Sequence, residues 1–459
     1  MPLHTHQADD APIAVRPQFA QAAETHSVPR NRLPAVGMPP EVAYQVIHDE
    51  LLLDGSSRLN LATFVTTWME PSAARLLAEC ADKNMIDKDE YPQTAELERR
   101  CVGMLAELWH APGHGRATGC STTGSSEAAM LAGLALKWRW RARRPPGQGW
   151  QRPNLVMGAN VQVCWEKFCR YFDVEPRLVP VGPEITHLTA AGAKEACDEN
   201  TIGVVAVLGS TYDGAYEPVA GICSALDELA VSGGPDVPVH VDGASGAFVA
   251  PFIDPDLEWD FRLPRVASIN ASGHKYGLVY PGVGWVVWRD PEALPDELVF
   301  DVSYLGGHMP TFALNFSRPG AQVVGQYFNF LRLGHEGYRQ VHQASRETAQ
   351  WLAAQLESHG PFVMVSRAEG IPVFAFEVAS GEPWTAYDLS DALRSSGWLV
   401  PAYTLPPALD HRSVLRVVVR NGFSRDMAQL FAHSVSESVA QLQRRHHGQP
   451  PKPRALFHH

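Results

Sequence analysis

Lys275 is the residue whose type and setting most directly suggest covalent chemistry. It ends the sequence Ser272-Gly-His-Lys275, which follows a strand-like run at 266–269. Small residues beside a lysine at a strand end allow a cofactor to approach closely, and desolvation lowers a lysine pKa so that the neutral amine can attack an aldehyde. Because most lysines are solvated surface groups, this interpretation depends on other residues.

Two further patterns supply groups that a phosphorylated aldehyde cofactor would need. Asp242 ends an apolar run at 237–241 and precedes Gly243-Ala-Ser-Gly, where a carboxylate can keep a ring nitrogen protonated. Gly124-Ser-Ser-Glu127 begins a helical run, and hydroxyl and N–H groups at such a start bind phosphate. The plainer alternatives are a turn aspartate and an ordinary helix N-cap. Since chance coincidence of all three patterns is much rarer than any one, their order predicts a pyridoxal phosphate site.

The elements around these residues predict an α/β fold. Short apolar runs bounded by Gly, Pro or Asn indicate strands buried on both faces of a mainly parallel sheet, at 154–157, 202–208, 237–242 and 284–288. Helical stretches, including 126–139 and 222–232, lie between them.

The pattern changes after residue 334 and predicts a smaller α+β domain. A long helix is expected at 339–358, strands at 372–378 and 413–419, and helices at 385–396 and 427–444. We therefore expect four parts: an N-terminal arm and helix (1–58), a large cofactor-binding domain (59–345), a small C-terminal domain (346–445) and a flexible tail (446–459).

The composition narrows the classes of protein to which the chain can belong. Its 459 residues are 45% hydrophobic and 19% charged, with a formal charge of −12. Such an acidic balance argues against a nucleic-acid surface, and we expect no nucleic-acid partner. The seven cysteines form no Cys-x-x-Cys pair, so we expect no metal and a reduced, cytoplasmic protein. No apolar run reaches about 18 residues, and we expect no membrane span.

Long phrases spread over residues 41–445 carry a resemblance to a known family. They are Asn60-Leu-Ala-Thr-Phe64, Ile86-Asp-Lys88, Glu90-Tyr-Pro-Gln93, Leu108-Trp-His-Ala-Pro112, Ala196-Cys-Asp-Glu-Asn-Thr-Ile-Gly203, Trp259-Asp-Phe-Arg-Leu-Pro-Arg265, Tyr304-Leu-Gly-Gly307 and Asn315-Phe-Ser-Arg-Pro319. The chain resembles the bacterial glutamate decarboxylases, which are group II pyridoxal-phosphate decarboxylases of fold type I. The resemblance implies pyridoxal 5'-phosphate as cofactor and conversion of L-glutamate to 4-aminobutanoate and carbon dioxide, with one proton consumed.

The resemblance also implies roles for individual residues. Lys275 is the lysine that carries the cofactor as a Schiff base, His274 contacts its phosphate, and Asp242 pairs with its ring nitrogen. Other cofactor-binding positions are Ser125, Ser126, Gln162, Thr211, the small residue Ala244, and Ser317 from a neighbouring subunit. Arg416 is expected to receive the substrate α-carboxylate, although a structural ion pair within its strand is the alternative. Thr63, Phe64 and Asp87 are expected around the distal carboxylate, where Asp87 requires protonation or an acidic environment.

Some positions depart from the family pattern or leave alternatives open. Glu166 stands where relatives carry a histidine, so we leave it out of the site. His459 is the candidate for a tail histidine that closes the site as pH rises.

The resemblance also bears on partners. A partner's Ser317 would require at least a dimer, and hexamers occur in the family. Prolines in the tail lead us not to expect calmodulin binding. The alternatives are a sister decarboxylase for another amino acid and a non-catalytic regulatory or assembly homologue.

Overall fold

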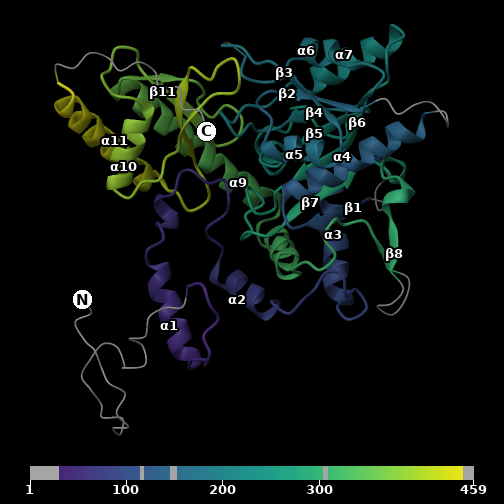
Figure 1. The fold of residues 1–459 in the computed structure, drawn as a ribbon, viewed down its shortest axis with the longest axis horizontal. Coiled ribbons are helices and arrows are strands. Elements are labelled where there is room, and N and C mark those ends of the chain that lie inside the picture. Colours follow the sequence, from purple (N-terminus) through teal and green to yellow (C-terminus); the bar gives the residue numbers. More distant parts are fainter. Residues whose placement is uncertain (1–29, 114–117, 145–151, 184, 303–308, 448–459) are drawn as a thin grey trace. The chain divides into compact units, whose positions relative to one another are not determined.

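The computed structural model describes residues 30–113, 118–144, 152–183, 185–302 and 309–447 in two separate units. The first unit, Met1–Ser56, contains helix α1 (Pro40–Leu51), close to the helix predicted from the sequence. The second unit, Ser57–His459, contains all of the other elements (Figure 1). The predicted tail at 446–459 lies almost entirely outside the described residues.

A seven-stranded sheet forms the centre of the second unit and confirms the predicted α/β class. Its strands are β1 (Thr118–Thr122), β2 (Asn154–Gly158), β3 (Glu175–Val179), β4 (Thr201–Val207), β5 (Val239–Asp242), β6 (Val266–Ala271) and β7 (Gly284–Trp288). They lie in the order β1-β7-β6-β5-β4-β2-β3, and β7 is antiparallel to both of its neighbours. The other strands therefore run in one direction, which brings their carboxyl ends, and the loops that follow, to the same edge.

Helices cover this sheet as expected for buried, Val-rich strands. They are α2 (Pro71–Glu79), α3 (Pro92–Leu108), α4 (Ser125–Ala142), α5 (Val163–Tyr171), α6 (Ala190–Glu195), α7 (Val219–Val231), α8 (Ala250–Ile253) and α9 (Ala321–His359). Helix α4 packs across β1, β4, β6 and β7 (Figure 1). The predicted helix at 339–358 was too short, because α9 also includes a segment before Gly334, where φ is 56°. Gly334 joins two helical stretches of α9. Because the helical sequence pattern is interrupted at this glycine, we predicted only the stretch that follows it.

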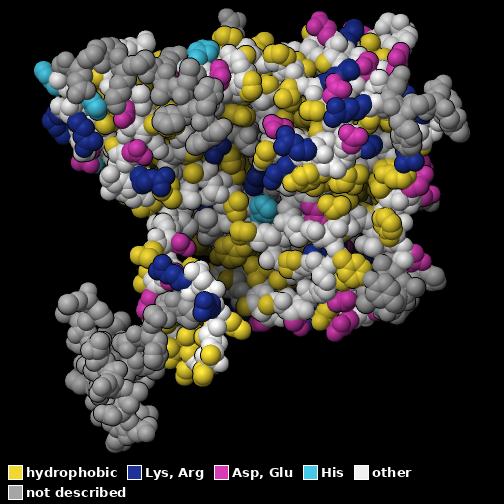
Figure 2. Space-filling model, in the orientation of Figure 1, with side chains coloured by type: hydrophobic (Ala, Val, Ile, Leu, Met, Phe, Trp, Pro, Cys, Tyr) yellow, Lys and Arg dark blue, Asp and Glu magenta, His cyan; other side chains and the backbone are white. Residues whose placement is uncertain are grey.

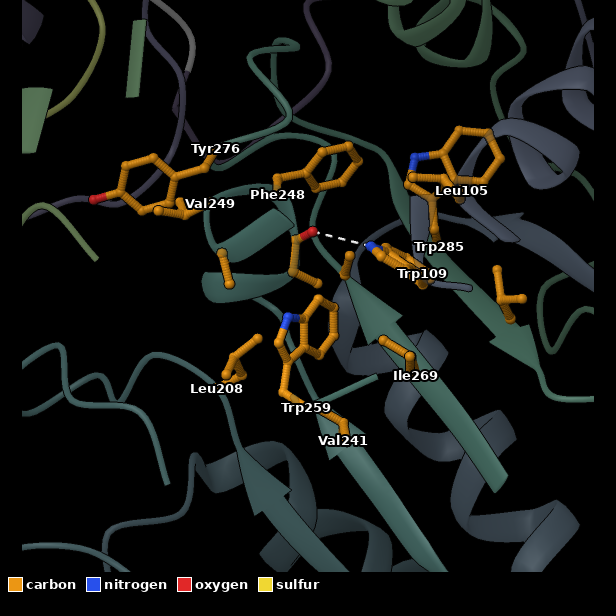
Figure 3. Packing of buried hydrophobic residues seen from close by; sticks show 14 of the residues in the cluster. Leu105, Trp109, Leu208, Val241, Phe248, Val249, Trp259, Ile269, Tyr276 and Trp285 are labelled. Carbon is orange, nitrogen blue, oxygen red and sulfur yellow. Dashed lines mark hydrogen bonds between the residues drawn. The ribbon is translucent and has the colours of Figure 1, made fainter. Parts of the chain in front are cut away.

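An aromatic cluster supports the strands that end at the site. Figure 3 shows Trp109, Phe248 and Trp259 packed beside Val241 of β5 and Ile269 of β6. Trp109 lies edge-on to both other aromatic rings, and its indole N–H donates to the Ala247 carbonyl at 3.0 Å (Figure 3). This satisfied polar contact fixes the segment that follows β5 within an apolar core.

A second, four-stranded antiparallel sheet has its own apolar cluster. It contains β10 (Phe362–Met364), β11 (Val373–Val378), β13 (Ser413–Val418) and β12 (Ala402–Thr404), in that order, with α10 (Ala386–Ser395) and α11 (Arg425–Arg445). This is the α+β arrangement predicted after residue 334. The expected domain boundary near residue 345 falls within α9, and residues 57–459 form one compact unit, so that division stays a prediction.

The surface of the described part carries charges of both signs. Figure 2 shows Lys and Arg side chains intermixed with Asp and Glu side chains over one face. Within the described ranges, no helix has both the length and the apolar character needed to cross a bilayer.

Candidate active site

A cavity of about 570 Å³ lies where the carboxyl ends of the strands meet. This volume is within the usual range for small-molecule sites. The cavity brings together eleven of the residues predicted from the sequence: Thr63, Phe64, Ser125, Ser126, Gln162, Thr211, Asp242, Ala244, His274, Lys275 and Arg416. Residues separated by more than 350 positions in the chain therefore share one site.

Asp242, the last residue of β5, has its carboxylate held by three donors. Trp165 Nε1 donates to Oδ2 at 2.7 Å, while Asn270 Nδ2 and the Ala244 N–H donate to Oδ1 at 3.1 Å each. The bond from the Ala244 N–H is the contact expected of a turn aspartate. The alternative of a turn aspartate therefore applies to Oδ1 of Asp242. The two side-chain donors come from other elements and restrict the orientation of the carboxylate within the cavity wall.

Lys275 lines the cavity rather than projecting into open solvent. Its Nζ donates to Ser245 Oγ at 3.1 Å. Burial lowers the pKa of Lys275, and the Asp242 carboxylate opposes that change. Thr66 fixes the lysine backbone, because its hydroxyl donates to the Lys275 carbonyl at 2.7 Å. A lysine amine with a lowered pKa, set close to a carboxylate, has the properties of a nucleophile.

The start of α4 leaves backbone N–H groups without a capping side chain. Gly124 precedes the helix and no side chain caps it, and Ser125 and Ser126 of its first turn line the cavity, so this helix start is suited to binding an anion. Gly284, the first residue of β7, allows this close packing, since a Cβ there would collide with Gly124 and with the amide nitrogen of Ser125. Ser125 Oγ also accepts a hydrogen bond from Ser272 Oγ at 2.7 Å, which joins this site to the lysine segment.

His274 borders the same end of the cavity. Its Nδ1 accepts from the Gly282 and Val283 N–H groups at 3.4 and 3.3 Å. Burial, with a smaller effect from Lys275, lowers the pKa of His274 to about 4. A neutral ring that accepts at Nδ1 carries its proton on Nε2. His274 thus offers one N–H donor for an anion.

Arg416 connects two of the loops that line the cavity. It projects from β13, and its guanidinium donates to the carbonyls of Thr211 at 2.5 Å and Ala62 at 2.7 Å. Its Cζ lies 4.6 Å from the Phe64 ring centroid. No carboxylate pairs with Arg416 among the residues the structure describes, which disfavours the alternative of a structural ion pair within the strand.

Gln162 and Glu166 differ in their relation to the cavity. Gln162 lines it and also caps α5, because its Oε1 accepts from the Cys164 N–H at 2.6 Å. Glu166, in the first turn of α5, is exposed and does not line the cavity. Glu166 therefore lies outside the cavity wall, and we leave it out of the site.

Asp87 and Ser317 do not line the cavity of a single chain. Their two segments lie together elsewhere: Asn84 Nδ2 donates to Ser317 Oγ at 3.3 Å, and the Met85 N–H donates to the Arg318 carbonyl at 2.9 Å. The role of Ser317, which we expected from a neighbouring subunit, stays a prediction. For Asp87, the expectation of a place beside Thr63 is not met within one chain, because these bonds hold its turn against the Ser317 segment. His459 lies outside the described residues.

Three residues that contact the central groups were not predicted as site residues. Asn270 faces Asp242 directly across the β5–β6 pair, which becomes evident only once the strand register is known. Ser245 stands in the Gly243-Ala-Ser-Gly motif, but nothing in the sequence indicated a bond to Lys275. Trp165 reaches Asp242 from α5, and a core tryptophan gives no sequence signal of such a contact.

Comparison with known proteins places this geometry among pyridoxal enzymes. The pyridoxal-dependent decarboxylase conserved domain matches residues 34–379. A glutamate decarboxylase of Aliivibrio fischeri is 53% identical over 445 residues, which is 96% of this chain and 95% of that protein. Glutamate decarboxylase 1 of Arabidopsis thaliana is 49% identical over 441 residues, covering 95% of this chain and 88% of the plant protein.

A solved structure gives the same result for the fold. The glutamate decarboxylase of Lactobacillus brevis superposes with a TM-score of 0.89 and 45% sequence identity, covering 93% of this chain and 98% of that one. The similarity therefore extends over both sheets and is not limited to the phosphate-binding segment.

Proposed function

This chain belongs to the pyridoxal-dependent decarboxylase family, and we propose that it is a glutamate decarboxylase, which converts L-glutamate to 4-aminobutanoate and carbon dioxide. The observation that carries the proposal is the placement of Lys275 and Asp242 in one cavity that begins at the uncapped start of α4. About half of the sequence is identical to glutamate decarboxylases over nearly their whole length, which supports glutamate as the substrate.

The residues of the cavity fit pyridoxal 5'-phosphate. The uncapped N–H groups of α4, the hydroxyls of Ser125 and Ser126 and the Nε2–H of His274 converge where a phosphate would be held. The small side chain of Ala244 and the amide of Gln162 also line the cavity. When bound, the cofactor supplies a protonated ring that accepts the electron pair released on loss of the α-carboxylate.

Lys275 and Asp242 perform complementary tasks. The lowered pKa of Lys275 increases the share of neutral amine that can bond to the cofactor aldehyde, and in its protonated form the freed amine could return a proton to the substrate Cα. Asp242 is held by donors and remains available to stabilise a positive ring nitrogen. Ser245 Oγ holds the Lys275 amine when that amine is not bonded to the cofactor.

The opposite side of the cavity would bind the substrate. Arg416 provides the fork of N–H donors that suits a carboxylate, and it organises the loops that carry Ala62 and Thr211. Thr63 and Phe64 line the part of the cavity next to this arginine, where we place the distal carboxylate. We assign the catalytic roles to Lys275, Asp242, Gln162 and Thr211, all of which line the cavity.

We assign Asp87 and Ser317 to the site of a second copy, which makes the enzyme at least a dimer. Both residues lie in segments joined by hydrogen bonds away from their own cavity. Co-expression of a Lys275→Ala chain with a Ser317→Trp chain tests this assignment. If the segments cross the interface, mixed dimers contain one intact site and recover activity that neither variant has alone; if both residues act within their own chain, no activity is recovered.

The function itself is tested by release of carbon dioxide from glutamate, aspartate and aromatic amino acids between mild acid and neutral pH. We expect glutamate alone to be turned over rapidly. Borohydride reduction of the holoprotein should fix the cofactor on the peptide that contains Lys275, and a Lys275→Ala variant should bind it only reversibly. Rapid turnover of another amino acid, or fixation on another lysine, would contradict the proposal. A role for His459 in closing the site stays a prediction.

A further inference from the structure

Behind Asp242, two neighbouring strands carry four polar side chains in a buried row. The β5–β6 register pairs His240 with Ser268 and Asp242 with Asn270. Residues two apart on a strand share a face, so both pairs project to the same side of the sheet. His240, Asn270 and Ser268 are each at most 1% exposed. Buried polar groups at this depth must satisfy one another, and the direction of each hydrogen bond can therefore be worked out.

The direction is fixed from the Asp242 end. The Asp242 carboxylate accepts from the Asn270 amide nitrogen at 3.1 Å. The Asn270 Oδ1 must then point the other way, and it lies 2.8 Å from His240 Nε2. An amide oxygen only accepts, so His240 Nε2 carries a proton. The opposite orientation of Asn270 would set its oxygen against the carboxylate and two acceptors would face each other.

The remaining ring nitrogen completes the row. His240 Nδ1 lies 2.8 Å from Ser268 Oγ, and on a neutral ring protonated at Nε2 it accepts the serine hydroxyl. Burial lowers the pKa of His240 to about 4, although Asp242 opposes this effect, so the ring is neutral at neutral pH. Each member of the row therefore donates toward Asp242, from Ser268 through His240 and Asn270.

Trp165 contacts two members of this row, Asp242 and His240. Its indole N–H donates to the second Asp242 oxygen at 2.7 Å, and its ring centroid lies 5.0 Å from that of His240. The same indole thus limits rotation of the carboxylate and fills the space beside the imidazole.

We propose that His240 is a positioning residue, which fixes the Asn270 amide in the orientation that donates to Asp242 and so holds that carboxylate in place to pair with the cofactor ring nitrogen. The inference rests on the proposed use of Asp242 as the partner of that nitrogen. It is reached through Asn270, since no direct bond joins His240 to Asp242 among the described residues. Without the Nε2–H, Asn270 Oδ1 has no donor in the described part of the chain and the amide is held only by its acceptors Asp242 and Ser125, which loosens the carboxylate and weakens its hold on a positive ring nitrogen.

The test compares four holoproteins: wild type, His240→Phe, His240→Gln and His342→Phe. Phenylalanine keeps an aromatic ring beside Trp165 and removes the donor. Glutamine keeps an N–H at the place of Nε2. His342 is the control, because it is also fully buried but packs against Tyr276, Tyr338 and Phe252 instead of the Asp242 row.

Two readouts are independent of turnover: the dissociation constant of pyridoxal phosphate, and the ¹⁵N resonance of labelled cofactor, which reports protonation of its ring nitrogen. We expect His240→Phe to weaken cofactor binding about tenfold to a hundredfold and to shift the resonance toward the unprotonated form. We expect His240→Gln to stay within about threefold of the wild type, and His342→Phe to match the wild type in both readouts.

The outcomes separate this inference from the proposed function. Unchanged affinity and ring protonation in His240→Phe would overturn the inference, as would a His240→Gln variant as impaired as the phenylalanine variant. If His240→Phe does not fold, Asn270→Leu, which removes the amide at similar volume, must give the same two changes. A wild-type protein that binds the cofactor with a protonated nitrogen yet releases no carbon dioxide from glutamate would refute only the proposed function.

Discussion

Two buried carboxylates in this molecule, Asp242 and Glu217, are each held by three hydrogen bonds but have different surroundings. The donors to Glu217 are the N–H groups of Val207 at 2.6 Å and Leu188 at 3.0 Å, and Asn160 Nδ2 at 2.9 Å. Two of these three are backbone groups, so Glu217 fastens the end of β4 to a neighbouring loop. Two of the three donors to Asp242 are side chains, which orient the carboxylate rather than join backbone segments.

The surroundings of Asp242 and Glu217, beyond their hydrogen-bond donors, explain why the two carboxylates have different roles. Asp242 borders the cavity near the Lys275 amine, while Glu217 is 2% exposed and does not line the cavity. Burial outweighs the three donors and raises the pKa of Glu217 to about 7, and the nearby acid Asp213 adds to the effect. Three hydrogen bonds to a buried carboxylate therefore serve folding at one site and chemistry at the other, depending on whether the carboxylate itself lines the cavity beside a cation.

The largest effect is expected from Asp242→Asn. This change removes the negative charge from the cavity and sets an amide against donors that already face it. We expect the rate of carbon dioxide release to fall at least about a hundredfold, the scale of a lost electrostatic contact at a reacting group. The free energy of unfolding, measured in urea, should fall by only about 1–3 kcal/mol. Retention of more than a tenth of the activity would contradict the chemical role assigned to this carboxylate.

The converse result is expected from Glu217→Ala. Three buried donors, two of them backbone N–H groups, would lose their acceptor, and we expect the free energy of unfolding to fall by about 3–5 kcal/mol. Activity per folded molecule should change less than about threefold, since Glu217 does not line the cavity. Glu79→Ala, at an exposed helix position, is the control and should cost less than about 1 kcal/mol. A large loss of activity with unchanged stability would remove the distinction between the two carboxylates.

Part of the site could be predicted from the sequence because the predicted strands end directly before residues that line the cavity. The 237–241 run placed Asp242 at a strand end, and the run before Ser272 did the same for Lys275. Both signals are local, since a strand and the residues that follow it are contiguous in the chain. The position of Arg416 depends instead on contacts between β13 and the distant loops that carry Ala62 and Thr211, and only the family resemblance indicated it.

The remaining features depend on packing between distant elements. Trp165 approaches Asp242 from α5, and no local pattern distinguishes it from the other buried tryptophans. The direction of the hydrogen bonds from Ser268 through His240 and Asn270 to Asp242 depends on the β5–β6 register, which this sequence alone did not reveal. The start of α9 was missed because Gly334 interrupts the helical pattern. Asp87 lies outside its own cavity, and its assignment depends on a second copy of the chain.

The pH dependence of stability should separate Glu217 from the row behind Asp242. The folded pKa of Glu217, about 7, exceeds its ordinary value of 4.5. Its contribution to stability is therefore complete below pH 4.5 and is lost as pH rises through about 7. The folded pKa of His240, about 4, is below its ordinary value of 6.5, so its contribution is complete above pH 6.5 and is lost as pH falls through about 4.

Urea unfolding of Glu217→Gln at pH 5 and pH 8 measures the first contribution. The stability advantage of the wild type over this variant should shrink on the order of 2–3 kcal/mol from pH 5 to pH 8, at most. For His240→Phe, the stability advantage of the wild type should instead shrink as the pH falls from 7 to 4. Parallel pH slopes in the two variants would mean that the two groups do not differ in their folded protonation states.

The smallest effect is expected from Trp165→Phe, which removes one of the three donors to Asp242. The phenyl ring keeps part of the packing against His240 and Phe168, while Oδ2 of Asp242 loses the indole N–H. One hydrogen bond to a charged group contributes about 1.5–3 kcal/mol, and water entering from the cavity can replace part of it, so we expect cofactor affinity and turnover to fall about threefold to tenfold. Trp109→Phe is the matched control, because its indole N–H donates to the Ala247 carbonyl in the core and not to the site. The control should lose stability in urea without a change in cofactor affinity of the folded protein. Equal cofactor affinities in the two variants would show that the donors from Asn270 and Ala244 alone suffice to hold the carboxylate.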